Sequence, residues 1–130
     1  AGIGGGFDAA LLVGYHSGGG SDGNPLAHTM NTDNVRVLVN GAEASEFLIN
    51  AYTAASVGVP VIAVSGDRAL CEAAKAYDPR IETAAVSEGR GNASLSIHPR
   101  LADQAIREAV GRALRGFGAG GPAPLPPSFE

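Results

Sequence analysis

Short apolar runs separated by polar stretches predict four strands. They cover residues 7–15, 35–39, 59–64 and 81–86. Continuous apolar runs of this length are typical of strands that are buried on both faces of a sheet. The sequence VPVIAV at residues 59–64 is almost entirely apolar, so we expect this strand to be fully buried.

Longer stretches place apolar residues at helical spacing and predict three helices. These stretches are residues 43–57, 68–77 and 99–114. Each has the recurrence at three and four positions that gives a helix one apolar face. Gly58 and Pro60 favour an end to the first helix, Asp67 is a typical N-cap for the second, and Pro99 suits the first turn of the third.

The order of these elements predicts an α/β fold. Strands alternate with helices, which indicates βαβ units in a parallel or mixed sheet with flanking helices. In such sheets the functional site lies outside the carboxyl ends of the strands. His16, the loop that follows it, and the turn at residues 65–67 should therefore lie on one rim of the sheet.

The remaining segments are rich in turn residues. Asn40-Gly41 predicts a tight turn, and residues 87–97, which are rich in Gly and Ser, predict an irregular stretch. Residues 116–130 are rich in Gly and Pro and are typical of an extended tail or linker. We therefore expect one α/β core over residues 1–115 and a tail over residues 116–130.

Composition narrows the class of protein. The chain has 130 residues, of which 45% are hydrophobic, and this suits one domain with a real core. The net charge is −4 and no basic stretch is present, so we expect no nucleic-acid partner. No apolar run approaches the roughly 20 residues of a membrane helix, so we expect no membrane span. The chain does not open with Met, and its Gly-rich start predicts a processed, cut or truncated chain.

The single cysteine, Cys71, excludes an intrachain disulfide. A chain without disulfides is typical of a reducing compartment, and we expect a cytoplasmic protein. Cys71 lies among apolar residues of a predicted helix, which favours a buried thiol over a nucleophile.

Candidate chemistry rests on a few side chains, namely His16, His28, His98 and Glu46. Imidazole nitrogens and carboxylate oxygens are the usual ligands of catalytic zinc. Neither a HExxH motif nor a CxxC pair is present, so spacing alone is weak evidence. Taken singly, His16 suits a strand end, Glu46 suits the first turn of a helix, and His98 suits a helix start.

Four blocks of sequence carry a more specific signal. They are LVGYH (12–16), LAHTM (26–30), VNG through SEFLINA (39–51) and VPVIAVSGD (59–67). In content, order and spacing these blocks resemble the DppA-type zinc D-aminopeptidases, and the resemblance covers roughly residues 7–115. The first two blocks and the helix block are its specific part, because the βαβ pattern would suit many families.

The resemblance implies roles for three residues. His16 and Glu46 correspond to metal ligands, and His28 corresponds to a catalytic histidine beside the metals. It also implies two zinc ions per site, release of N-terminal residues, often D-amino acids, from short peptides, and assembly into a homo-oligomeric ring. A loop histidine bonded to the backbone is the alternative for His28.

The sequence also departs from this family. The family's Asp-x-Glu strand motif and its Asn-Asp-Ser-His segment, both sources of ligands, have no counterpart here. His16 and Glu46 cannot fill a two-zinc site. We expect another chain or segment to supply the missing ligands, since retention of His16, His28 and Glu46 together indicates chemistry. The alternative is a non-catalytic scaffold or a small-molecule-binding subunit of the same fold.

Overall fold

A four-stranded mixed sheet forms the centre of the protein. The computed structural model describes residues 3, 6–118 and 120–130, so part of the Gly-rich start lies outside the described residues. The strand order is β1-β4-β5-β6, formed by β1 (Ala10–Tyr15), β4 (Val61–Asp67), β5 (Glu82–Arg90) and β6 (Ala93–Ser96). β1, β4 and β5 are mutually parallel, and β6 is antiparallel to β5. The α/β fold with βαβ units is therefore confirmed.

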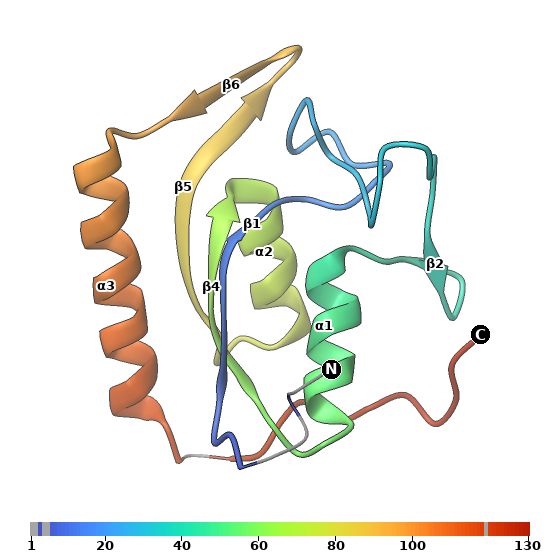
Figure 1. The fold of residues 1–130 in the computed structure, drawn as a ribbon, viewed down its shortest axis with the longest axis vertical. Coiled ribbons are helices and arrows are strands. Elements are labelled where there is room, and N and C mark those ends of the chain that lie inside the picture. Colours follow the sequence, from blue (N-terminus) through green and yellow to red (C-terminus); the bar gives the residue numbers. More distant parts are fainter. Residues whose placement is uncertain (1–2, 4–5, 119) are drawn as a thin grey trace.

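Helices cover both faces of this sheet (Figure 1). α1 (Glu46–Ala55) and α2 (Arg68–Tyr77) pack on one face, and α3 (Pro99–Gly116) packs against β4 and β5 on the other. The core between the sheet and the first two helices contains Phe47, Ala51, Val64, Leu70, Ala74 and Ile81. Burial of these apolar groups holds the layers together and positions the carboxyl ends of the strands.

The predicted helix at 68–77 has the bounds found in the structure, because both of its ends carry strong local signals. The Asp67 side chain accepts a hydrogen bond from the Leu70 N–H at 2.8 Å, which confirms the predicted N-cap. The helix predicted at 43–57 is shorter, because Ser45 caps it and Glu46 becomes its first residue. His98 and Pro99 start the third helix as predicted.

Two predictions of local structure were wrong. Residues 35–39 do not form a strand of the main sheet. Instead β2 (Leu38–Val39) pairs with β3 (Ala42–Glu43) in a separate antiparallel ribbon. Asn40 and Gly41 both have positive φ, at 52° and 75°, and this tight turn reverses the chain immediately.

The predicted irregular stretch at residues 87–97 is instead a hairpin of β5 and β6. It projects beyond the helices (Figure 1), and all four residues of β6 are exposed. Ala93, Leu95 and Ile97 do alternate with serines, but this short strand signal was outweighed in the sequence by the turn residues just before it.

Residues 120–130 run back toward α1 (Figure 1). Near the end of the chain, the Asn40 side chain donates to the Ser128 carbonyl at 2.8 Å, and the rings of Tyr52 and Phe129 are 5.3 Å apart. The division into core and tail stays a prediction. Among the described residues, no helix combines the length and the apolar character needed to cross a bilayer.

Candidate metal centre

His16 lies directly after β1, at the rim where the parallel strands end. Its Nδ1 is 2.9 Å from the Ser17 carbonyl oxygen. Because a carbonyl oxygen can only accept, this contact assigns the proton to Nδ1 and leaves the Nε2 lone pair free in a neutral ring. A backbone partner on one ring nitrogen is the usual arrangement for a histidine that binds metal through the other.

Glu46 is the first residue of α1 and points its carboxylate toward the same rim. The Ser45 hydroxyl caps this helix by accepting from the Leu48 N–H at 3.3 Å. The capped N-terminus favours a negative charge in the first turn. The Glu46 Oε2 is 3.8 Å from the His16 Nε2.

His28 comes from the long loop between β1 and β2. Its Nδ1 is 2.7 Å from the Leu26 carbonyl oxygen, so its Nε2 is also left as an acceptor. The rings of His28 and His16 have centroids 4.4 Å apart and planes inclined by 39°. The two imidazole rings therefore lie side by side.

The three predicted site residues thus converge. One donor atom from each of His16, His28 and Glu46 lies within 4.8 Å of the other two. Two ligand atoms on a tetrahedral zinc are roughly 3.4 Å apart, so the 3.8 Å between His16 and Glu46 needs only a small side-chain adjustment. The donor set is also of the type that zinc prefers, two imidazoles and a carboxylate. The arrangement fits a metal ion, and the roles of the three residues stay predictions.

Two buried side chains hold this cluster in place, and sequence patterns did not mark their contacts. The Asp67 carboxylate accepts from the Ser17 N–H at 2.7 Å and from its hydroxyl at 3.0 Å, and this fixes the residue after His16. The Thr29 hydroxyl accepts from the Gly19 N–H and donates to the Ala44 carbonyl. Asp67 was predicted as a cap, but nothing in the sequence pairs it with Ser17.

Other candidate groups lie outside the cluster. His98 accepts from the Arg100 N–H and serves as the N-cap of α3. Cys71 is buried, and burial, with a smaller effect from Asp67, raises the pKa of its thiol to about 11. The predicted burial of this thiol is confirmed, and a raised pKa of this kind keeps it protonated at neutral pH.

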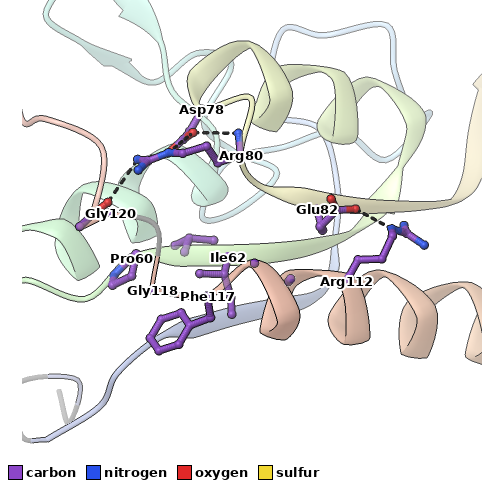
Figure 2. Close-up of a pocket in the computed structure, with 13 residues that line it drawn as sticks. Pro60, Ile62, Asp78, Arg80, Glu82, Arg112, Phe117, Gly118 and Gly120 are labelled. Atoms are coloured by element: carbon purple, nitrogen blue, oxygen red, sulfur yellow. Dashed lines mark hydrogen bonds and ion pairs between the residues drawn. The ribbon is translucent and has the colours of Figure 1, made fainter.

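A cavity of about 220 Å³ lies at the opposite, amino end of β4, between α3 and the segment that follows it (Figure 2). Its charged side chains already neutralise each other. Arg80 pairs with Asp78 at 2.7 Å, and Arg112 pairs with Glu82 at 2.8 Å. These pairs stabilise the local structure, and the histidine cluster remains the stronger candidate for chemistry.

Comparison with known proteins agrees with this geometry. The chain is 29% identical over 110 residues to the D-aminopeptidase of Bacillus subtilis (strain 168), covering 84% of this chain and 40% of that protein. The fold matches the solved structure of the Zn-dependent D-aminopeptidase DppA from Bacillus subtilis, a self-compartmentalizing protease. The TM-score is 0.83 at 28% identity, over 95% of this chain and 45% of that one. The chain thus spans less than half the length of these relatives. A model of the peptidase M55 family, described as D-aminopeptidase, matches residues 1–130, and the chain therefore belongs to that family.

Proposed function

We propose that this protein is a zinc-dependent aminopeptidase that releases N-terminal residues, D-amino acids among them, from short peptides. The observation that carries the proposal is the convergence of two imidazoles and one carboxylate within 4.8 Å, in a chain of the D-aminopeptidase family. The Nδ1 of each imidazole is already engaged with a backbone carbonyl, so both Nε2 atoms are available.

In this proposal His16 and Glu46 bind zinc. Their side chains are 30% and 31% exposed, so further donors can reach the cluster from outside. Two tetrahedral zinc ions need more protein ligands than the cluster supplies. We therefore propose that residues of another chain or segment complete a two-zinc site.

His28 is assigned to proton transfer. The residue lies beside the proposed ligands, and its Nε2 is left as an acceptor, so it can take up a proton from the water consumed in hydrolysis and then pass that proton to the departing amine of the peptide. The Leu26 carbonyl holds the ring in the tautomer that this role needs. When bound, zinc supplies Lewis acidity and lowers the pKa of water toward neutrality.

The proposed assembly is a homo-oligomeric ring. Support comes from the solved relative, which is described as a self-compartmentalizing protease. In such an arrangement, restricted access would favour short peptides over folded proteins.

Metal content and peptide hydrolysis test the proposal together. Zinc bound by the native assembly is measured by mass spectrometry of metals, and release of D-alanine or L-alanine from dipeptides is followed by chromatography. We expect bound zinc and hydrolysis for the wild type, and loss of both in His16→Ala. His98→Asn is the matched control, because Asn keeps the helix cap and His98 lies outside the cluster. Zinc content unchanged by His16→Ala would contradict the ligand assignment.

A second variant separates the two roles open to His28. If His28 moves a proton, His28→Gln keeps its zinc and loses about 10²–10⁴-fold in kcat. If His28 is a third ligand, zinc is lost along with activity. The second result would overturn the catalytic assignment while leaving the metal centre intact.

A further inference from the structure

Thr29 is the most deeply buried polar residue near the cluster, with a side chain that makes two hydrogen bonds. The residue is 0% exposed. Its hydroxyl accepts from the Gly19 N–H at 3.0 Å and donates to the Ala44 carbonyl at 2.8 Å. Both donor and acceptor capacity of the hydroxyl are used in one place.

The two partners belong to the segments that carry the other site residues. Gly19 lies in the loop that begins at His16, and Ala44 lies just ahead of the helix that begins at Glu46. Thr29 itself follows His28. One hydroxyl therefore links the three segments that carry the imidazoles and the carboxylate.

Backbone hydrogen bonds are not what joins the loop after His16 to the start of α1 among the described residues. The loop contacts the start of α1 by packing alone at Gly18, where an added Cβ would lie 2.9 Å from the Cα and Cβ of Ser45. Gly19 and Ala44 are both buried, so the N–H and the carbonyl would lack water as a substitute partner. On the other side, the Asn34 side chain donates to the Thr29 carbonyl at 3.2 Å and holds the residue in place.

We propose that Thr29 is a positioning residue that sets the spacing of His16, His28 and Glu46 through this buried hydroxyl. The inference rests on the proposed metal centre for its functional meaning, but the geometric link does not depend on metal. Groups that hydrogen-bond a metal ligand directly typically change metal affinity by 10–100-fold when they are removed, and Thr29 acts on the ligands through the backbone segments that carry them.

Two substitutions separate the hydroxyl from the shape of the side chain. Thr29→Val keeps the shape and removes both hydrogen bonds, whereas Thr29→Ser keeps the hydroxyl. The zinc dissociation constant of the native assembly is measured by competition with a chromophoric chelator. We expect 10–100-fold weaker binding for Thr29→Val and an affinity like that of the wild type for Thr29→Ser. Equal affinities for the two variants would overturn the proposal.

Two controls exclude a purely structural effect. Thr53→Val removes a hydroxyl that bonds only the Ile49 carbonyl within α1, on an exposed position. Ile81→Val destabilises the core away from the cluster. Both should bind zinc like the wild type at temperatures well below their melting points. Weakened binding in Ile81→Val equal to that in Thr29→Val would show that stability alone sets the affinity, and would refute the proposal.

A metal-free readout keeps the inference distinct from the proposed function. Nuclear Overhauser contacts between the rings of His16 and His28, and hydrogen exchange of the Gly19 amide, are measured without zinc. We expect Thr29→Val to lose the ring contacts and to speed exchange, and Thr29→Ser to retain both. If the wild type binds no zinc, the metal centre fails as a proposal. Unchanged ring contacts in Thr29→Val would still refute the positioning role.

Discussion

The Asp67 carboxylate has two structural roles, capping α2 and holding Ser17, and a pair of substitutions can separate them. It caps α2 through the Leu70 N–H and holds Ser17 through two further hydrogen bonds. Asp67→Ser keeps a good capping side chain but is too short to reach Ser17. Asp67→Ala removes the cap and the contact with Ser17 together.

The expected losses of stability follow from the hydrogen-bond donors that each substitution leaves without an acceptor. Asp67 and Ser17 are 1% and 4% exposed, so water cannot replace the lost acceptor. A buried N–H without a partner costs about 1–3 kcal/mol, and hydrogen bonds to a charged group contribute about 1.5–3 kcal/mol. We expect Asp67→Ser to lower the free energy of unfolding by about 2–3 kcal/mol. Asp67→Ala should lose about 1 kcal/mol more, the usual contribution of an N-cap.

Urea unfolding followed by circular dichroism measures these changes. With a slope of about 2 kcal/mol per molar urea, Asp67→Ser should move the midpoint down by about 1–1.5 M. Because Ser17 follows His16, the same variant should also bind zinc more weakly. A stability within about 0.5 kcal/mol of the wild type, the scatter of ordinary surface substitutions, would refute the structural role of the contact with Ser17. Equal losses in the two variants would refute the separate contribution of the cap.

Four further predictions concern packing and ionisation. A methyl group at Gly66 would overlap a backbone carbonyl of β1, so Gly66→Ala should cost about 1–3 kcal/mol in urea unfolding. Gly111→Ala, in the open middle of α3, should instead gain up to about 1 kcal/mol. Cys71, whose pKa is about 11, should react with iodoacetamide at pH 7.5 only after unfolding, and rapid labelling of the folded protein would contradict its burial. Hydrogen bonding from Arg80 lowers the pKa of Asp78, so the stability that this carboxylate contributes is present above its ordinary pKa of about 3.9 and is lost as pH falls below it. Urea midpoints between pH 2.5 and pH 7 should therefore fall less steeply in Asp78→Asn, and parallel curves would show that the ion pair has no effect.

Local signals predicted the parts of the fold that depend on neighbours in sequence. The α2 helix was placed correctly because a capping Asp precedes it and Asp78-Pro79 ends it. The parallel order of β1, β4 and β5 followed from the alternation of apolar runs and helical stripes. These patterns are local because helix caps and side-chain periodicity involve residues a few positions apart.

Elements with a short or interrupted apolar pattern were missed. In the β5–β6 hairpin, the alternation of apolar and polar residues at 93–97 is only five residues long, and the Gly- and Ser-rich composition before it favoured a loop. The segment at 35–39 has strand-like composition, but the turn at Asn40-Gly41 allows it to pair only with the residues that follow. Strand partners depend on the path of the chain, which composition does not encode.

The candidate residues could be named from the sequence, because His16, His28 and Glu46 stand in blocks that resemble one family. Their meeting within 4.8 Å could not, since it depends on contacts between segments far apart in the chain. The Asp67 carboxylate reaches Ser17 across 50 positions, and the Thr29 hydroxyl reaches Ala44 across 15. Each of these groups is polar and deeply buried, and finds its partner only when the core closes around it. The sequence thus determined which chemical groups are present at each position. The distances between these groups and their burial decide whether they can act as one site, and both depend on tertiary packing.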